Sequence, residues 1–205
     1  MSETSASLSR HDLYELCVVS PAQLVPLLAA IHGKHPTHLA EDFAGTACLC
    51  DQWVSDIPVG TSTGVDLDPE ALNHRPTIDG VTKHCSDVLD PSVLSLPKAD
   101  ITHAGNFSIG YMHTRAELLG YLRLARQRLA EGGVFLCDTY GGEGTFTLGE
   151  VHRDHLIPDG PHKNKRVRYT WEQREADPTT GMVTDVLHFR VGQSGRILAE
   201  FEDAF

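Results

Sequence analysis

Long apolar runs are missing from this 205-residue sequence. No stretch approaches the ~18 consecutive apolar residues that a membrane-spanning helix needs. The first residues, Met1 to Ser5, are polar and lack the basic and then hydrophobic pattern of a secretory signal. We therefore expect a cytoplasmic protein with no membrane partner.

Cysteine is scarce and has no metal-binding pattern. The five cysteines are an odd number in a chain too large to need disulfide staples, so reduced thiols are expected. Only one residue separates Cys48 from Cys50, which is the wrong spacing for a zinc knuckle. The sequence therefore predicts no metal site.

Positive charge is also in short supply. The chain has 17 Lys and Arg residues against 28 Asp and Glu residues, a net charge of −11. Such a balance repels polyphosphate and argues against a nucleic-acid partner. A small or cationic substrate fits this charge better.

The length and the 40% hydrophobic content suit one soluble globular domain, which can bury about 70% of its unfolded surface. We divide this domain, residues 1–205, into N-terminal helices (1–36), a core (37–150) and an antiparallel extension (151–205). Leucine spacing and a Ser-Pro start predict a helix over Pro21–His32, and a shorter helix is expected over Arg10–Leu16.

The stretch from Thr37 to Asp51 organises the rest of the chain. A short apolar segment runs into Glu41 and Asp42, a turn of small residues follows, and helix-compatible spacing resumes at Cys48. This order predicts a strand, a tight turn and a helix N-terminus, where backbone N–H groups meet a ligand. Of the three glycines usual in such a turn only Gly45 is present, so this stretch alone also fits an ordinary strand-to-helix turn.

Three more strands are followed by polar residues. The strand Thr63–Val65 leads into Asp66, 21 residues after Gly45, where nucleoside-binding folds place a ribose ligand. Capping of the following turn is the alternative role for Asp66. The other two strands are Gly80–Cys85, followed by Asp87, and Ala99–Gly105, followed by Asn106.

A long helix and a fifth strand complete the alternation. Leucines at helical spacing predict a helix over Thr114–Glu131, ended by Gly132 and Gly133, and Val134–Asp138 is expected as a buried strand. Five strands alternating with helices predict an α/β fold with a Rossmann-like, doubly wound, mainly parallel sheet. Its ligand crevice would lie at the carboxyl ends of the strands.

The pattern changes after Glu150. Residues 152–166 are polar and contain prolines, and we interpret the basic run from His162 to Arg166 as a solvated loop rather than a binding patch. The alternating segments Arg168–Arg174 and Met182–Val191 predict an antiparallel hairpin. Ile197–Phe205 is expected as a third antiparallel strand.

The order of these motifs resembles class I S-adenosylmethionine-dependent methyltransferases, in particular a bacterial subgroup. The matching motifs are E-D-F-A-G-T-A from Glu41, G-V-D-L-D-P-E from Gly64, N-F-S from Asn106 and L-A-E-G-G-V-F from Leu129. The match extends from H-D-L-Y-E-L-C, which begins at His11, to the final D-A-F. The resemblance implies an enzyme that transfers a methyl group from S-adenosylmethionine to a small-molecule acceptor by in-line attack.

The resemblance also assigns cofactor-binding roles. Glu41 and the turn Ala44–Ala47 would hold the methionine part of the cofactor. Asp66 would take the ribose hydroxyls, and Asp87 with Val88 would meet the adenine. The full set of expected cofactor-binding residues is Tyr14, Glu41, Phe43, Ala44, Gly45, Thr46, Asp66, Leu67, Asp87, Val88 and Asn106.

The resemblance places the chemistry after the fourth strand. Asn106 and Phe107 would flank the sulfonium and the path of the methyl group, and together with Tyr111 they are the expected catalytic residues. Methyl transfer needs little acid–base work, which explains why no nucleophile–base triad is evident. If an acceptor proton must be removed, the candidates near this edge are His103, His113, Tyr111 and Tyr140.

Two other classes of protein share part of this pattern. A nicotinamide-dependent oxidoreductase would share the strand, the turn and Asp66 but would want a fuller glycine motif. A non-catalytic or truncated cofactor-binding domain would keep the fold without turnover.

The resembling family continues beyond the point where this chain stops. We therefore expect the fifth strand to lie at or near a sheet edge, covered by residues 168–205 with help from self-association into a homo-oligomer. Methyl transfer by the 205-residue chain is expected to be low or absent, whereas the cofactor half of the site persists. The hairpin from Arg168 to Val191 is expected to cover part of the acceptor pocket.

Overall fold

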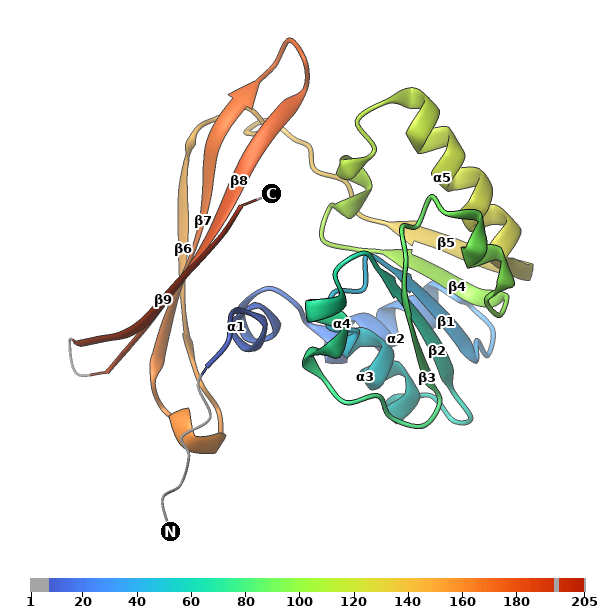
Figure 1. Cartoon of the computed structure of the whole chain (residues 1–205), viewed down its shortest axis with the longest axis horizontal. Coiled ribbons are helices and arrows are strands. Elements are labelled where there is room, and N and C mark those ends of the chain that lie inside the picture. Colours follow the sequence, from blue (N-terminus) through green and yellow to red (C-terminus); the bar gives the residue numbers. More distant parts are fainter. Residues whose placement is uncertain (1–7, 194–195, 205) are drawn as a thin grey trace. The chain divides into compact units, whose positions relative to one another are not determined.

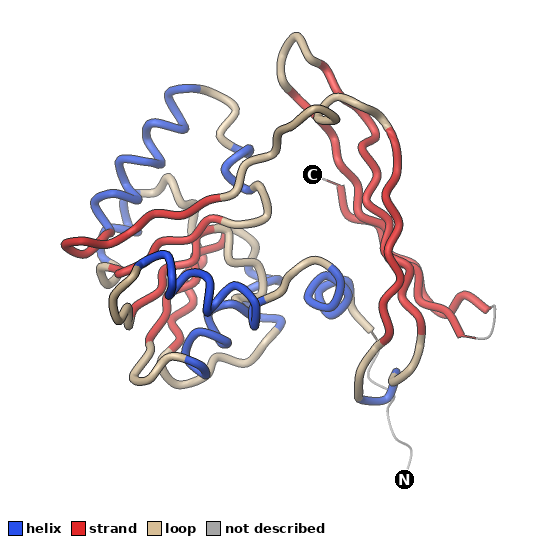
Figure 2. Tube along the Cα trace, turned by 180° about the vertical axis from the view of Figure 1, so that it is seen from behind, coloured by secondary structure: helices blue, strands red, loops and turns tan. Residues whose placement is uncertain are grey.

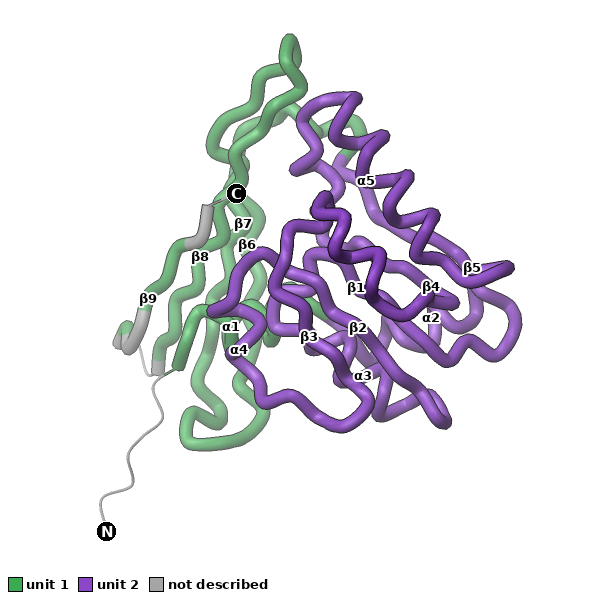
Figure 3. Tube along the Cα trace, turned by 45° about the vertical axis from the view of Figure 1, so that its right-hand side comes forward, with its two compact units in different colours: residues 1–19, 141–205 green, residues 20–140 purple. Residues whose placement is uncertain are grey.

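The computed structural model describes residues 8–193 and 196–204, and the chain divides into two compact units. One unit contains residues 20–140, and the other combines residues 1–19 with residues 141–205 (Figure 3). The single domain expected from the sequence thus contains two units, and the second begins at Gly141 rather than at residue 151. The first N-terminal helix belongs to this second unit and the next helix to the first.

The unit of residues 20–140 is built on a five-stranded sheet in which every described pairing is parallel (Figure 1). The strand order is β3-β2-β1-β4-β5, so the order reverses between β1 and β4, which is where doubly wound folds bind ligands. The predicted fold class is confirmed. The strands are β1 (His38–Asp42), β2 (Thr61–Asp66), β3 (Val81–Cys85), β4 (Ala99–Ala104) and β5 (Leu129–Cys137).

Helices cover both faces of this sheet (Figure 2). On one face, α2 and α3 pack on Leu39 and Ile101. On the other face, Tyr121 and Ala125 of α5 join the core around Val65. The helical segments of this unit are α2 (Pro21–His32), α3 (Cys48–Asp56), α4 (Pro69–His74) and α5 (Arg115–Arg128), with the short helices η1 (Pro91–Ser95) and η2 (Ser108–Tyr111).

The junction of α5 and β5 differs from the prediction. A capping box between Thr114 and Glu117 starts α5, but the helix ends at Arg128, three residues before the predicted Glu131. Leu129 already has extended backbone angles and pairs with Ala99 of β4, so sheet pairing overrides helix propensity there. The fifth strand lies at the edge of the described sheet, as expected.

The second unit is a four-stranded antiparallel sheet of order β6-β7-β8-β9 with α1 (Arg10–Cys17) against one face (Figure 1). We call the face that packs on Leu13 and Cys17 of α1 the inner face. Its buried strand residues are Val167, Tyr169, Leu187, Phe189 and Val191. The strands are β6 (Gly149–Leu156), β7 (Arg166–Asp177), β8 (Met182–Gln193) and β9 (Arg196–Ala204), and the short helix η3 spans Gly160–His162.

The sequence analysis missed the strand β6, which pairs with β7 through His152 and Thr170, among other pairs. Most of β6 is exposed on both faces, so its sequence lacks the apolar alternation that reveals a half-buried strand. The predicted hairpin and the third antiparallel strand are present. The position of Phe205 lies outside the described residues.

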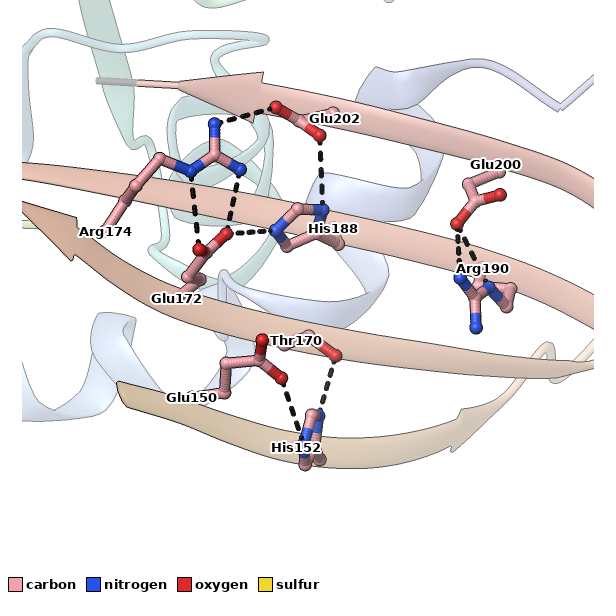
Figure 4. Close-up of polar contacts among 9 residues, drawn as sticks. All are labelled: Glu150, His152, Thr170, Glu172, Arg174, His188, Arg190, Glu200 and Glu202. Carbon is pink, nitrogen blue, oxygen red and sulfur yellow. Dashed lines mark hydrogen bonds and ion pairs between the residues drawn. The ribbon is translucent and has the colours of Figure 1, made fainter. Parts of the chain in front are cut away.

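The opposite face of this sheet, which we call the outer face, carries ion pairs across its strands (Figure 4). Glu172 on β7 accepts hydrogen bonds from Arg174 and lies 2.8 Å from His188 Nε2. These bonds, with the Arg174 contribution the larger, lower the pKa of Glu172 to about 2. Arg190 Nη2 likewise donates a hydrogen bond to Glu200 Oε1 at 2.6 Å. Exposed pairs add little stability singly, and here they help to hold the register of β7, β8 and β9.

Among the described residues, no single helix is both long and apolar enough to cross a membrane, and only α1 and α2 taken together meet that length and composition.

Candidate functional site

The carboxyl ends of the parallel strands bring the predicted site residues to one edge of the sheet. Register places Asp42 of β1 beside Val65 of β2 on one side and Ala104 of β4 on the other. The three strands therefore end side by side at Asp42, Asp66 and Ala104. Each is followed by a turn, and these turns form the candidate site.

The turn after β1 has an unusual backbone. Phe43, Gly45 and Ala47 all have left-handed φ angles, of 59°, 53° and 61°. Such angles cost about 1–2 kcal/mol at a residue with a side chain, so the surroundings must hold them. The Ala44 N–H donates to Val65 O at 3.0 Å, and the Ala47 N–H donates to Ala44 O at 2.8 Å. Ala47 begins α3 without a side-chain cap, which leaves the first helical N–H groups facing the turn.

Gly64 on β2 explains how the turn and α3 approach the sheet so closely. A Cβ atom at Gly64 would lie 3.1 Å from Ala44 Cβ, 3.2 Å from Ala47 Cβ and 3.3 Å from Cys50 Sγ. In the usual glycine-rich motif, a glycine of the turn allows this close helix–strand packing. Here a glycine of the neighbouring strand and two alanines of the turn allow it instead.

Asp66, the last residue of β2, is bound to two turns at once. Its Oδ2 accepts the Gly45 N–H at 2.6 Å, and its Oδ1 accepts the Asp68 N–H at 2.8 Å. The turn-capping role left open by the sequence is therefore real. It does not exclude ligand binding, because each carboxylate oxygen has room for a second donor such as a hydroxyl.

Glu41 is a carboxylic acid held in a desolvated position. Although part of the residue is exposed, burial of its carboxyl group raises the pKa to about 8. The Cys50 thiol donates to Glu41 Oε2 at 3.3 Å, which is a weak hydrogen bond. Glu41 is thus mostly neutral at pH 7 in the free protein, and it would gain most from a cationic partner.

The neighbouring Asp42 has a different, structural role. Its side chain is fully buried, with Oδ1 2.6 Å from Arg128 Nη1 and Oδ2 accepting the Tyr121 hydroxyl at 3.0 Å. This pair joins the end of β1 to α5. Of the two adjacent acids, only Glu41 belongs to the candidate site.

Asp138, which the sequence analysis missed, controls the turn after β4. Its two carboxylate oxygens accept the N–H groups of Asn106 at 3.1 Å and Phe107 at 2.7 Å. Both residues have left-handed φ angles, 54° and 60°, so one carboxylate holds two consecutive unfavourable conformations. The sequence could not reveal this role of Asp138. Its partners are backbone N–H groups, which nearly every residue has, so no particular residue type marks them.

We expect Asp138→Ala to loosen this turn. Loss of two hydrogen bonds to a charged acceptor should speed amide exchange at Asn106 and Phe107 by about tenfold or more. Asp100→Ala is the matched control, since Asp100 accepts the N–H groups of Thr37 and His38 elsewhere in the same unit. Hydrogen exchange followed by NMR measures both. Unchanged exchange in Asp138→Ala would show that Asp138 does not hold the turn.

Aromatic rings surround the same turn. The ring of Phe43 lies 6.1 Å from that of Tyr111, and the ring of Phe107 lies 5.6 Å from that of Tyr140. Phe107 and Tyr111 are 44% and 53% exposed, which is high for such large side chains. They give this edge of the sheet an apolar, accessible border.

No protein-family model matches the chain, and no curated protein matches its sequence. Solved structures match well. DesVI from Streptomyces venezuelae is 19% identical with a TM-score of 0.74, over 97% of this chain and 83% of DesVI. The sugar N-methyltransferase KedS8 from a Streptoalloteichus species is 19% identical with a TM-score of 0.69, over 100% and 83%. CalS10, an amino pentose methyltransferase from Micromonospora echinaspora, is 18% identical with a TM-score of 0.68, over 100% and 84%.

The chain has a methyltransferase fold. Each match covers nearly the whole chain, so the antiparallel sheet is part of the shared architecture. Because the identities are below 20%, these structural matches establish the fold alone. The roles of individual residues rest on the geometry described above.

Four other residues that were predicted to bind the cofactor differ in their surroundings. Asp87 is exposed after β3, and its Oδ1 accepts the Leu89 N–H at 2.8 Å. Val88 is buried in the core beside α5, so a ligand would meet its backbone rather than its side chain. Leu67 is 70% exposed next to Asp66. Tyr14 lies on α1 in the other unit, half-buried against the antiparallel sheet, and its cofactor role stays a prediction.

The proton-accepting candidates also differ from one another. His103 is buried near the end of β4, and desolvation lowers its pKa, so its ring is neutral. A Cβ atom on Gly105 would come within 2.5 Å of its Cε1, so the glycine lets the ring lie over the backbone. His113 is exposed, and Tyr140 is half-buried.

Proposed function

We propose that the chain is an enzyme that transfers a methyl group from S-adenosylmethionine to a small-molecule acceptor. The observation that carries this proposal is the Asp66 carboxylate. It is held at the end of β2 by the turn after β1, one strand from the point where the strand order of this methyltransferase fold reverses. This is the place where nucleoside-binding folds of this type present an acid to a ribose.

The residues at this edge fit the chemical groups of the cofactor. The desolvated acid Glu41 suits the ammonium of the methionine part, and the N–H groups at the start of α3 suit its carboxylate. Asp66 suits the ribose hydroxyls. Asp87, Val88 and Leu67 would border the adenine, with Leu67 offering an exposed apolar side chain.

Methyl transfer requires little from the protein beyond alignment of the acceptor with the methyl group. The cofactor supplies a methyl group on a sulfonium, which is already a good leaving group. Asn106, Phe107 and Tyr111 would border the methyl path, exclude water and orient the acceptor. Well-oriented reactants supply up to ~7–11 kcal/mol of barrier reduction. As the acceptor forms its bond to the methyl carbon, it loses one proton, which His103, His113, Tyr111, Tyr140 or solvent would accept.

An amine is the acceptor that we propose to test first. Two of the solved structures with this fold are named as a sugar N-methyltransferase and an amino pentose methyltransferase. The net charge of −11 favours a cationic substrate, and an amine is cationic until it is deprotonated for attack. The cytoplasmic location and self-association expected from the sequence remain proposals.

Ligand-induced stabilisation separates this function from the alternatives. S-adenosylhomocysteine is expected to raise the unfolding temperature, because a ligand that binds only the native state stabilises it. NAD is expected to have no effect, and the opposite pattern would indicate an oxidoreductase. A turnover assay with methyl-labelled S-adenosylmethionine and amino sugars then distinguishes an enzyme from a non-catalytic cofactor-binding domain.

A further inference from the structure

His103 differs from the other histidines of the chain in its burial. All twelve histidines lie in the described part of the chain, and His103 alone is buried, with 9% of its surface exposed. Its Nδ1 is buried and has no hydrogen-bond partner among the described residues. A buried polar atom without a partner lowers stability, so packing alone does not account for a histidine at this position.

A second histidine of the same sheet shows how a ring is satisfied within the protein. His38 begins β1, its Nδ1 lies 2.8 Å from Thr61 Oγ1, and its Nε2 lies 3.2 Å from Thr63 Oγ1. Both of its ring nitrogens thus have a partner on the neighbouring strand β2, although this ring is less deeply buried. His103 lies near the carboxyl ends of the strands, is more deeply buried and has an unpartnered nitrogen.

Strand register places His103 directly beside Glu41. The two residues are partners in the pairing of β1 with β4, two positions beyond the pair Leu39–Ile101. Because alternate residues of a strand share a face, both side chains lie on the face that carries Leu39 and Ile101. On the other side of Glu41 the partner is Gly64, which has no side chain. His103 therefore supplies the polar side chain next to Glu41 in this row.

The ring of His103 extends toward the candidate site. A Cβ atom on Gly105 would lie 2.5 Å from its Cε1 and 3.2 Å from its Nε2, so the ring reaches past the end of β4. Asn106 and Phe107, which follow, are exposed, and Glu41 is partly exposed. The pair formed by His103 and Glu41 thus borders the accessible edge of the sheet.

These two side chains suit an ammonium group. An ammonium has three N–H donors, and one carboxylate leaves at least one of them for another acceptor. A neutral imidazole offers one acceptor nitrogen. Desolvation lowers the pKa of His103, an effect that the charges of Asp138 and Asp42 only partly oppose, and the ring is therefore kept neutral.

We propose that His103 and Glu41 together bind the ammonium group of S-adenosylmethionine, with a ring nitrogen of His103 accepting one of its N–H groups. The ammonium supplies a charged donor to a ring that has an unpartnered nitrogen. This inference rests on the proposed function and adds one cofactor-binding residue to it. Because the occupied nitrogen cannot also take the proton of the methyl acceptor, that role is left to His113, Tyr111, Tyr140 or solvent.

S-adenosylhomocysteine and its desamino analogue test the proposal, because they differ only in the ammonium group. In the wild type, the ring ¹⁵N signals of His103 are expected to shift strongly with S-adenosylhomocysteine and little with the analogue. His103→Leu removes both ring nitrogens and is expected to bind S-adenosylhomocysteine about tenfold or more weakly, with unchanged affinity for the analogue. His38→Leu, the control in the same sheet, is expected to change neither affinity.

A structural role for His103 predicts a different pattern. His103→Leu would then keep the wild-type affinity for S-adenosylhomocysteine or lose affinity for both ligands to the same extent, and either outcome overturns the proposal. His103→Asn keeps an acceptor oxygen near the position of Nδ1 and is expected to discriminate between the ligands better than His103→Leu. If His103→Leu does not fold, equal shifts of the wild-type ring signals with the two ligands overturn the proposal.

The affinity of the wild type for S-adenosylhomocysteine keeps this proposal separate from the proposed function. If the wild type does not bind S-adenosylhomocysteine, the proposed function fails. If the wild type and His103→Leu bind it equally well, only the role of His103 fails.

Discussion

Asp66→Ala is expected to weaken S-adenosylhomocysteine binding by ~1–3 kcal/mol, or about 5–150-fold. The variant loses a charge-assisted hydrogen-bond acceptor for the ribose diol. It also releases the Gly45 N–H, which Asp66 holds at 2.6 Å, so the turn after β1 loses one of its restraints. Calorimetric titration measures the change in affinity.

Two further variants separate these contributions. Asp68→Ala is the matched control, because the Asp68 carboxylate caps α4 by accepting the Glu70 N–H and lies outside the proposed site. Its affinity is expected to stay at the wild-type value. Asp66→Asn keeps one acceptor oxygen and should fall between the two. Wild-type affinity in Asp66→Ala would remove Asp66 from the site.

We also expect Glu41 to release a proton when S-adenosylhomocysteine binds. With a pKa of about 8, Glu41 is mostly neutral at pH 7 and must ionise to pair with the ammonium of the ligand. Binding of S-adenosylhomocysteine at pH 7 should therefore release close to one proton, and affinity should rise with pH up to about 8. Calorimetry in buffers with different ionisation enthalpies counts the protons.

Two controls for the proton release are the variant Glu41→Gln and a ligand that lacks the amino acid part of S-adenosylhomocysteine. The variant should bind more weakly and release no proton. 5′-Methylthioadenosine lacks the amino acid part, so it should release no proton from the wild type. Equal proton release by the wild type and Glu41→Gln would assign the proton to another group.

The same pKa has a consequence for the stability of the free protein. Burial raises the pKa of Glu41 from its ordinary 4.5 in the unfolded chain to about 8 in the folded one. Between these values the unfolded state is the more ionised, so stability falls as pH rises from 4.5 to 8. In Glu41→Gln this part of the pH dependence should disappear, as urea unfolding at several pH values would show.

The parallel sheet was predictable because its elements carry local signals. The strands that end in Glu41–Asp42 and Asp66, and the strand that Asn106 follows, indicate this edge of the sheet without any tertiary information. The Thr114–Glu117 capping box similarly marks the start of α5. The end of α5 was not predictable, because Leu129 leaves the helix to pair with Ala99, a residue 30 positions earlier in the chain.

The parts that sequence reasoning missed depend on contacts between distant residues. β6 has no apolar alternation, and only its pairing with β7 makes it a strand. Asp138 acts on backbone N–H groups more than 30 residues away.

The structure also changes how the predicted hairpin should be tested. β7 and β8 are the central strands of the antiparallel sheet and supply most of its apolar inner face. Deleting Arg168 to Val191 would therefore remove the core of that unit, and loss of activity would mean little.

Mapping the amide shifts caused by S-adenosylhomocysteine tests the central claim most directly. In ¹H–¹⁵N NMR spectra of the full chain, we expect the largest changes in the turns after β1, β2, β3 and β4. The amides concerned are those of Glu41 to Ala47, Asp66 and Leu67, Asp87 and Val88, and Asn106 and Phe107. Saturable changes confined to these amides would support the proposed site. No change at saturating ligand, or changes centred elsewhere, would contradict it.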